Sequence, residues 1–368
     1  MKKSMKILIS GGGTGGHVFP AIAIADALKK RDPDVAILFA GANGRMEMER
    51  VPAAGYEIVG LPVAGFQRKL TFKNITFFFK LAASMLKARR LVRSFQPDVA
   101  VGVGGYASGP VLRAAASQGI PTILQEQNSY PGVTNKILAR KARRICVAYP
   151  GMERFFPSEK IVLTGNPVRQ NLLAGVDRAM ACQELGLDEK KQTVLVVGGS
   201  LGARSINNGI ANDIEQIRKR TDVQFLWQCG KYYFDEMKQL LQGKNVSNIV
   251  LVPFISRMDM AYDVADVVIS RAGACTISEL ALLGKASVLV PSPNVAEDHQ
   301  TKNAMSLVKE GAALMIPDHE TPGRLVRDAL ELLDDEAYRK QLEEKVRLFA
   351  HPDSAEKIAE EIEKFAGK

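Results

Sequence analysis

Short runs of β-branched and apolar residues alternate with longer amphipathic stretches along the whole chain. This pattern is typical of parallel sheets with helices on both faces, because strands buried on both faces read as nearly continuous apolar runs. It predicts an α/β fold. Strands are expected over residues 6–10, 35–40, 99–103, 122–125, 144–147 and 161–164 in the first half, and over 193–197, 224–228, 249–252, 267–270, 286–290 and 313–316 in the second.

The two halves begin alike, each with an apolar strand that runs into a glycine-rich turn and then a helix. Residues 11–16 (GGGTGG) are matched by residues 198–202 (GGSLG), and the turn-rich stretch 165–169 (GNPVR) is the expected boundary. A length of 368 residues with 46% hydrophobic content also favours two domains. We therefore predict two doubly wound, Rossmann-like domains that face each other across a cleft. Their expected spans are 1–165 and 166–351, with a C-terminal helix over 352–368 that packs back on the first.

The charge of the chain is basic and unevenly distributed. Lysine and arginine total 49 against 40 acidic residues, and residues 67–97 contain eight basic residues and no acidic one. An anionic partner is expected at this stretch. Charge alone does not choose between nucleic acid, anionic lipid and phosphorylated substrates.

Cysteine spacing and hydropathy indicate the compartment. The four cysteines have no paired spacing, which favours free thiols in a reducing cytoplasm over disulfides or a zinc site. Residues 1–10 read as a first strand rather than a signal peptide. No segment reaches the roughly 20 apolar residues of a spanning helix, so a soluble or peripheral protein is expected.

Three glycine-rich turns, at residues 11–16, 104–109 and 198–202, follow predicted strands. Any one of them could merely let a strand turn tightly. Three at the carboxyl ends of parallel strands, where open α/β sheets bind ligands, favour phosphate binding. An NAD site would need an acidic residue after the second strand, where residues 41–45 read GANGR; Arg45 keeps an NADP site open.

His17 and Glu126 are the candidate proton-transfer groups. His17 directly follows the first glycine turn, so its imidazole could accept a proton from an attacking hydroxyl, or it could only pack against the loop. Glu126 lies in the polar run 125–128 (QEQN), at the end of a strand that would ordinarily stay apolar. The alternative there is an N-cap for the helix after Pro131.

In the second half, residues 270–279 (SRAGACTISE) leave a strand and open a helix near Cys275. The exposed amides at that helix start would stabilise a departing diphosphate, and Glu279 could hold a ribose diol. The alternative is a capping box formed by Thr276 and Glu279. Residues 297–300 (EDHQ) lack a second histidine at metal-binding spacing, so no metal site is expected.

Residues 66–93 combine apolar side chains, many of them aromatic, with basic ones. Such a patch suits an interfacial helix on an anionic bilayer. The alternative is an ordinary amphipathic helix with a solvated basic face. The predicted membrane contacts are Phe72, Ile75, Phe78, Phe79, Lys69, Lys73 and Lys80.

Taken together, the motifs at 12–20 (GGTGGHVFP), 104–106 (GGY), 126–128 (EQN), 165–169 (GNPVR), 198–200 (GGS) and 271–274 (RAGA) resemble the MurG family. These are peptidoglycan N-acetylglucosaminyltransferases. The resemblance covers almost the whole chain in the right order. It implies a GT-B fold, with the acceptor on the first domain and UDP-N-acetylglucosamine mainly on the second.

The resemblance also assigns binding residues. Donor contacts are implied for Thr14, Gly15, Gly16, Asn128, Arg169, Ser200, Ile255, Ala274, Cys275, Thr276, Ile277, Ser278, Glu279 and Gln300, and acceptor-diphosphate contacts for Gly15, Gly104, Gly105 and Tyr106. Leu201 and His299 depart from the commoner family pattern, which has glutamine at both positions. These departures affect the expected side-chain contacts to the diphosphate and the sugar.

The expected reaction is an inverting transfer of N-acetylglucosamine to the C4 hydroxyl of undecaprenyl-diphospho-N-acetylmuramoyl-pentapeptide, the lipid I to lipid II step of peptidoglycan synthesis. His17 would be the general base, with Glu126 as its competitor or support. No cofactor, metal or nucleic acid is expected. The enzyme would act at the cytoplasmic face of the cell membrane, and cell-wall synthesis proteins are partners the resemblance leaves open. The alternatives are a UDP-sugar epimerase and a non-catalytic nucleotide-sugar-binding subunit.

Overall fold

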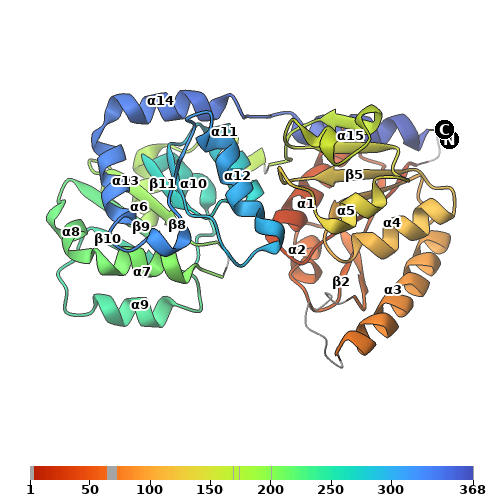
Figure 1. The fold of residues 1–368 in the computed structure, drawn as a ribbon, viewed down its shortest axis with the longest axis horizontal. Helices are drawn as coiled ribbons and strands as arrows, with labels where there is room; N and C mark the ends of the chain where they lie inside the picture. Colours follow the sequence, from red (N-terminus) through yellow and green to blue (C-terminus); the bar gives the residue numbers. More distant parts are fainter. Residues whose placement is uncertain (1–3, 64–72, 169, 174, 200, 368) are drawn as a thin grey trace. The chain divides into compact units, whose positions relative to one another are not determined.

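A computed structural model describes residues 4–63, 73–168, 170–173, 175–199 and 201–367. The chain divides into two compact units (Figure 1). Unit 1 comprises Met1–Arg169 and His351–Lys368, and unit 2 comprises Gln170–Ala350. The division therefore falls within four residues of the boundary expected at 165.

Unit 1 contains a seven-stranded parallel sheet with the order β3-β2-β1-β4-β5-β6-β7. Its strands are β1 (Lys6–Gly11), β2 (Ala36–Ala42), β3 (Glu57–Leu61), β4 (Val99–Gly104), β5 (Thr122–Glu126), β6 (Arg144–Val147) and β7 (Ile161–Leu163). Because all strands run in the same direction, the turns after β1, β4 and β5 lie at one edge of the sheet.

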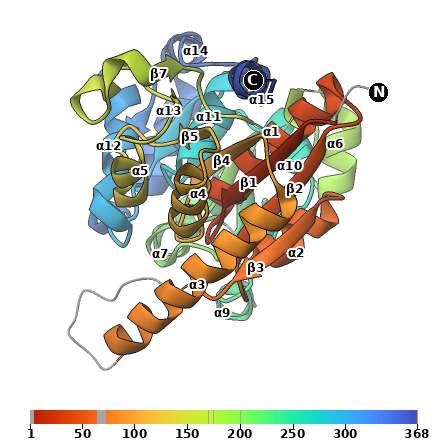
Figure 2. The ribbon, with the colours of Figure 1, turned by 90° about the vertical axis from the view of Figure 1, so that its right-hand side faces the viewer.

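Helices cover both faces of this sheet (Figure 2). One face packs on α1 (Gly15–Arg31), α2 (Glu47–Ala53) and α15 (Ser354–Ala366), and the other on α3 (Lys73–Phe95), α4 (Ser108–Ser117) and α5 (Val133–Leu138). Two short 3₁₀ turns, η1 (Met152–Arg154) and η2 (Ser158–Lys160), precede β7. Strand alternation assigns the faces: Ile7 and Ile9 lie in the core with α1, while Leu8 lies in the core with α4.

The C-terminal helix α15 belongs to unit 1. Ile358 and Ile362 are fully buried in the same core as α1. Ion pairs join the exposed edges of the two helices, with Arg31 3.5 Å from Glu360 and 2.8 Å from Glu363. Burial of the apolar face supplies most of the attachment, since exposed ion pairs contribute little.

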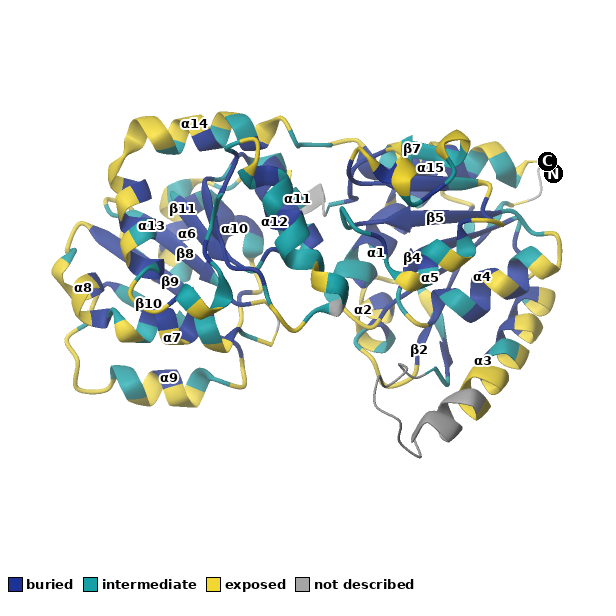
Figure 3. Cartoon of the chain, viewed as in Figure 1, coloured by how far each residue is buried: buried dark blue, intermediate teal, exposed yellow. Residues whose placement is uncertain are grey.

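Unit 2 contains a six-stranded parallel sheet with the order β10-β9-β8-β11-β12-β13. Its strands are β8 (Gln192–Val197), β9 (Val223–Gln228), β10 (Ile249–Val252), β11 (Val267–Ser270), β12 (Ser287–Leu289) and β13 (Leu314–Met315). Its strands are largely buried (Figure 3). The main core contains the fully buried Trp227.

As in unit 1, the helices of unit 2 alternate with the strands along the chain. The main core packs on α7 (Arg204–Asn212), α8 (Ile214–Lys219), α9 (Phe234–Leu241), α13 (Leu325–Asp334) and α14 (Glu336–Arg347), and a smaller core lies between α6 (Arg178–Leu185) and α10 (Met258–Val264). The remaining elements are α11 (Ala274–Leu283), α12 (His299–Val308), and the 3₁₀ turns η3 (Gln170–Leu173), η4 (Ala296–Asp298) and η5 (Asp318–Glu320).

The predicted α/β class is confirmed, and every predicted strand is present within two residues of its expected ends. The strand β3 was not predicted. It lies at the edge of the sheet and begins with the exposed Glu57, so it lacks the continuous apolar run of a central strand.

His351 generates a prediction about pH and stability. Its Cβ packs so closely on Gly165 that a Cβ at that glycine would lie 2.2 Å away. Burial lowers the pKa of His351 below its ordinary value of 6.5, and the nearby Lys357 adds to this effect. The unfolded chain then binds more protons, so stability should fall as the pH drops below about 6.5 toward the lowered value.

We expect His351→Gln to weaken this acid-side loss, measured as the urea midpoint at pH 7.5 and pH 5.0. His319→Gln is the matched control, because the His319 side chain is 82% exposed. An identical pH dependence in the wild type and in both variants would contradict the assignment.

Candidate active site

The glycine turn between β1 and α1 is built around a buried carboxylate that the sequence analysis missed. Glu47, at the start of α2, is fully buried. Its Oε2 accepts a hydrogen bond from the Gly13 amide at 2.9 Å, and its Oε1 accepts one from the Ala42 amide at 2.9 Å. The only feature of the sequence that could have identified Glu47 is that it is an acidic residue shortly after the second strand. The turn is therefore held to the end of β2 by Glu47.

This carboxylate changes the interpretation of the glycine fingerprint. The Gly13 amide donates to Glu47, and the helix α1 begins two residues later, at Gly15. The Glu47 oxygens also lie against Gly12, where a Cβ would be 2.1 Å from Oε1. Glu47 thus occupies the Gly13 amide that the fingerprint would offer to a dinucleotide pyrophosphate, which counts against the NAD and NADP interpretations.

His17 lies in the first turn of α1 and is half-buried. Its Nδ1 is 3.2 Å from the Gly12 carbonyl oxygen and 3.2 Å from the Thr14 hydroxyl. Because a carbonyl oxygen only accepts, the Gly12 contact assigns the proton of the neutral ring to Nδ1. Nε2 then carries the lone pair that a general base requires.

The second glycine turn lies directly against this ring. Gly104 has a φ of +98°, and a Cβ there would lie 2.7 Å from Cδ2 and 2.8 Å from Nε2 of His17. Glycine is therefore required both by the backbone conformation and by the ring. Gly105 lies next to it and Tyr106 is 58% exposed, so these predicted acceptor-diphosphate residues share one loop beside His17.

Glu126 ends β5 and is buried. Its Oε1 accepts from the backbone amide and the side chain of Asn128, at 3.0 and 3.1 Å. Its Oε2 accepts from the Gly132 amide at 3.2 Å and the Asn135 side chain at 2.9 Å. Burial raises the pKa of Glu126, and the four N–H donors oppose that rise. Its contacts fix the loop that carries Asn128, the predicted donor contact.

In unit 2, two of the predicted donor residues line one cavity of about 800 Å³ at the carboxyl edge of the sheet. Thr276 and Gln300 lie on its wall together with Gly198, Gly199 and Gly273. The helix α11 starts at Ala274 with Gly273 as its N-cap residue, so Thr276 lies inside the helix. The capping-box alternative for Thr276 and Glu279 is therefore wrong. The run 274–279 opens α11, and of this run Thr276 lines the cavity.

Two further residues hold loops of this region in place. Glu279 is buried, and its Oε2 accepts a hydrogen bond from the Tyr262 hydroxyl at 2.9 Å. Gln228 ends β9, and its amide donates to the carbonyl oxygens of Gly199 at 3.0 Å and Pro253 at 3.3 Å. Gln228 was not predicted, and it joins the glycine turn to the segment that leads to the buried Ile255.

Some predicted site residues cannot be placed. Arg169 and Ser200 lie outside the described residues. Thr14, Gly15, Gly16, Asn128 and Arg169 belong to unit 1, while Ser200, Ile255, the run 274–279 and Gln300 belong to unit 2. Within the described part of the chain, no group of three or more His, Cys, Asp or Glu residues could hold a metal ion.

The basic and aromatic stretch forms part of α3. Phe72 and Lys69 lie outside the described residues, and α3 includes Lys73, Ile75 and Phe78. Phe79 is 73% exposed and Lys80 is exposed. No helix among the described residues is long and apolar enough to span a bilayer.

A shallow groove of about 570 Å³ runs along the same helix. Leu86, Lys87 and Arg90 line it, all of them exposed, together with Ala83, Leu91, Ser94 and Val59 of β3. The groove therefore has an apolar floor and cationic groups beside it.

Comparisons with known proteins indicate one family over nearly the whole chain. The glycosyltransferase family 28 N-terminal domain matches residues 7–147, and its C-terminal domain matches residues 193–358. A protein of Bacteroides fragilis named UDP-N-acetylglucosamine--N-acetylmuramyl-(pentapeptide) pyrophosphoryl-undecaprenol N-acetylglucosamine transferase is 55% identical, over 99% of this chain and 96% of that protein.

Two solved structures share the fold. The crystal structure of MurG from Acinetobacter baumannii has a TM-score of 0.77 and 30% identity, and covers 98% of this chain and 99% of its own. A UDP-GlcNAc 2-epimerase from Neisseria meningitidis, bound to UDP-GlcNAc, has a TM-score of 0.71 at 15% identity, and covers 98% of this chain and 100% of its own. The second likeness shows the fold alone.

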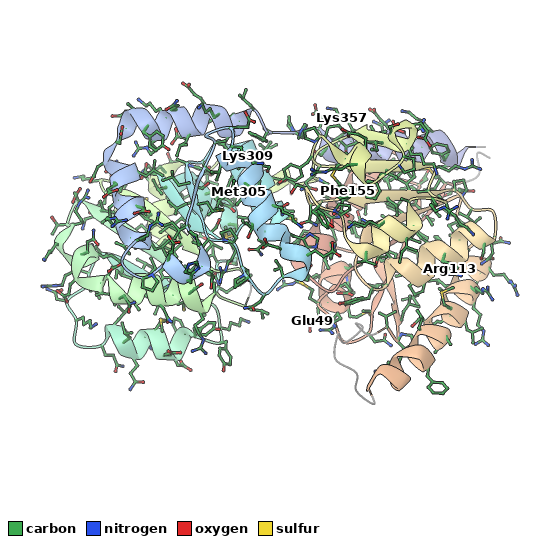
Figure 4. All side chains as sticks on the ribbon, viewed as in Figure 1. Glu49, Arg113, Phe155, Met305, Lys309 and Lys357 are labelled. Carbon is green, nitrogen blue, oxygen red and sulfur yellow. The ribbon has the colours of Figure 1, made fainter. Side chains whose placement is uncertain are left out.

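The buried Glu47 gives a stability prediction. Glu47→Gln keeps the shape but replaces one acceptor oxygen by a donor that opposes a backbone N–H. We expect a loss of about 1–3 kcal/mol in the free energy of unfolding, the usual cost of an unmade buried hydrogen bond, measured by urea denaturation. Glu49→Gln is the control, because Glu49 is exposed on the same helix (Figure 4). Equal effects of the two substitutions would rule out the role of Glu47.

Proposed function

The chain belongs to glycosyltransferase family 28, and on this premise we propose that it transfers N-acetylglucosamine from UDP-N-acetylglucosamine to undecaprenyl-diphospho-N-acetylmuramoyl-pentapeptide. The observation that carries the proposal is the 55% identity, over nearly the whole of both chains, to a protein with that named activity. The proposed step converts lipid I into lipid II in peptidoglycan synthesis.

Unit 2 binds the donor in this proposal. The diphosphate lies at the start of α11, where the helix dipole favours negative charge. The carboxylate of Glu279, oriented by the Tyr262 hydroxyl, accepts hydrogen bonds from the ribose diol. Gln300 contacts the sugar, and the backbone near Ile255 contacts the uracil. Arg169 and Ser200 complete this set as the resemblance implies.

Unit 1 supplies the proton acceptor. The C4 oxygen of the muramoyl sugar forms a bond to the anomeric carbon of N-acetylglucosamine, and the bond from that carbon to the β-phosphate oxygen breaks. The hydroxyl proton passes to Nε2 of His17, and UDP leaves with the electron pair of the broken bond. The Gly12 carbonyl orients the ring through Nδ1 and stabilises the imidazolium that forms.

Glu126 takes the supporting role rather than the competing one. Its two oxygens accept four N–H bonds that fix the loop from Asn128 to Gly132. Taking up a proton would cost at least one of these acceptor positions. Glu126 is therefore a positioning residue for Asn128, and the loop at 104–106 binds the acceptor diphosphate.

The enzyme acts as a peripheral protein at the cytoplasmic face of the cell membrane. The exposed Phe79 and Leu86 and the basic residues of α3 form the contact, in which apolar burial adds to attraction by anionic lipid. The lipid-linked acceptor is held in that membrane, so attachment places the enzyme where its acceptor is.

The direct test supplies radiolabelled UDP-N-acetylglucosamine and a short-chain analogue of the muramoyl-pentapeptide lipid, with a chelator present. Label in the lipid product supports the transferase and its independence of a dissociable metal. Consumption of the nucleotide sugar without a lipid product would instead favour an epimerase. Binding without turnover would favour a non-catalytic subunit.

The assignment of His17 predicts a large loss of turnover. His17→Ala should lower kcat by about 10²–10⁴-fold, the range for loss of a general base, with UDP affinity retained. Gly104→Ala should also lower kcat, because its methyl group would displace the His17 ring. Gly109→Ala is the matched control, since a Cβ there meets no atom closer than 3.6 Å. Unchanged kcat in His17→Ala would exclude it as the base.

The proposed membrane contact of α3 predicts that reversing its exposed charges weakens binding to anionic vesicles. Reversing two exposed charges of α3, in Lys87→Glu with Arg90→Glu, should weaken binding to vesicles that contain phosphatidylglycerol by more than about tenfold, since each basic residue near such a surface contributes about 1 kcal/mol. Lys357→Glu is the control, because Lys357 is exposed on α15, on the opposite face of the sheet (Figure 4). Equal sedimentation of both variants with the vesicles would contradict this surface.

A further inference from the structure

Arg271 follows β11 and is directed into the protein, where its guanidinium bonds to three other segments of unit 2. The Nη1 group donates to the carbonyl oxygens of Val290 at 3.1 Å and Pro291 at 3.2 Å, and to Asp318. The Nη2 group donates to the Ser205 hydroxyl at 2.9 Å. The side chain is 16% exposed. We call Arg271, Ser205 and Asp318 the Arg271 cluster.

The members of this cluster also bond to each other. The Ser205 hydroxyl donates to Oδ1 of Asp318 at 2.5 Å, so the carboxylate accepts from both Arg271 and Ser205. Ser205 lies in the first turn of α7, after the glycine turn of β8, and Asp318 opens η5 after β13. The cluster thus connects the segments that follow β8, β11, β12 and β13.

All three residues line the cavity that we assign to the donor, as do Ser292 and Gln300. The segment after β12 links the cluster to Gln300. Arg271 holds the carbonyl oxygens of Val290 and Pro291, and the amide of Ser292 donates to Oε1 of Gln300 at 2.8 Å. With its oxygen used in this way, Gln300 presents its NH₂ group as the part able to donate to a sugar oxygen.

We propose that the Arg271 cluster is a positioning element for the donor: Arg271, neutralised by Asp318, fixes the walls of the cavity and the orientation of Gln300. This inference rests on the proposed function of the same cavity. Asp318 and Ser205 are therefore positioning residues, although neither belongs to a motif that the sequence analysis singled out. The charge of the donor diphosphate is met by the α11 amides, while the charge of Arg271 is met by Asp318.

Placement of binding groups is sensitive to small displacements, since a shift of about 1 Å can cost about 100-fold in rate or affinity. A buried ion pair that loses one partner also leaves an uncompensated charge. Loss of Asp318 or Ser205 should therefore loosen the segments at 198–205 and 290–294, even though the substituted side chain is not the one that contacts the sugar.

We test the cluster with Asp318→Asn, Ser205→Ala and the double variant in the full chain. We expect each single change to raise the KM for UDP-N-acetylglucosamine and the Kd for UDP by about tenfold or more. The KM for the acceptor analogue and kcat at saturating donor should stay within about twofold of the wild type. Because both changes act through Arg271, the rise in donor KM in the double variant should be smaller than the product of the rises in the two single variants.

Asp334→Asn is the matched control. Asp334 bonds to Arg220 at 2.8 Å in the same unit, but 56% of its side chain is exposed and it lies at the end of α13. It should leave the KM for the donor unchanged. Amide hydrogen exchange should become faster at 198–205 and 290–294 in the cluster variants alone.

The outcomes separate the inference from the proposed function. A wild type that shows no transfer overturns the proposed function. A wild type that transfers, with a normal donor KM in both Asp318→Asn and Ser205→Ala, overturns the cluster alone. A lower melting temperature and smaller active fraction with an unchanged donor KM would mean a purely structural role and would also overturn it. If Asp318→Asn does not fold, the milder Ser205→Ala decides the question.

Discussion

Parallel strand pairing is the constraint on which the rest of this protein depends. In each unit every strand runs the same way, so every strand delivers its following turn to the same edge of the sheet. Residues separated by dozens of positions are thereby brought together, as with His17 after β1 and Gly104 at the end of β4. Ligands bind at this edge because the turns there present backbone amides and side chains that are not part of the hydrogen-bond pattern between strands.

The turns at this edge lie outside the hydrogen-bond pattern of the sheet, and buried or partly buried polar side chains bond to them instead. Glu47 holds the first glycine turn, Glu126 holds the loop after β5, and Arg271 with Asp318 holds four segments of unit 2. Glu47 and Glu126 are buried, Arg271 and Asp318 are partly buried, and their hydrogen bonds offset the cost of desolvating them and hold each turn in place. The residues proposed to touch substrate, such as His17 and Gln300, are less buried and are each oriented by one of these fixed segments.

The proposed roles of the two units follow from the groups that each unit offers to a ligand. Unit 1 has the exposed basic and apolar surface of α3, which suits a lipid-linked and anionic acceptor. Unit 2 offers a cavity at the start of α11, whose amides suit the diphosphate of a nucleotide sugar. In the proposed reaction, groups of unit 1 therefore meet the attacking hydroxyl, and the start of α11 in unit 2 meets the leaving diphosphate.

The sequence by itself determined the α/β class, the positions of nearly all strands and the start of α11, because burial on both faces of a sheet imposes a continuous apolar run and glycine marks each turn. It also singled out His17 and Glu126 as chemically unusual positions. Only the tertiary structure decided what those groups bond to: that Nδ1 of His17 lies 3.2 Å from the Gly12 carbonyl oxygen, that Glu126 accepts four N–H bonds, and that the Gly13 amide is occupied by Glu47. The partners of Arg271, at Ser205 and Asp318, are 66 and 47 residues away from it. No local pattern specifies such partners, since hydrogen bonds at the edge of a parallel sheet join segments that are neighbours only after the strands have paired.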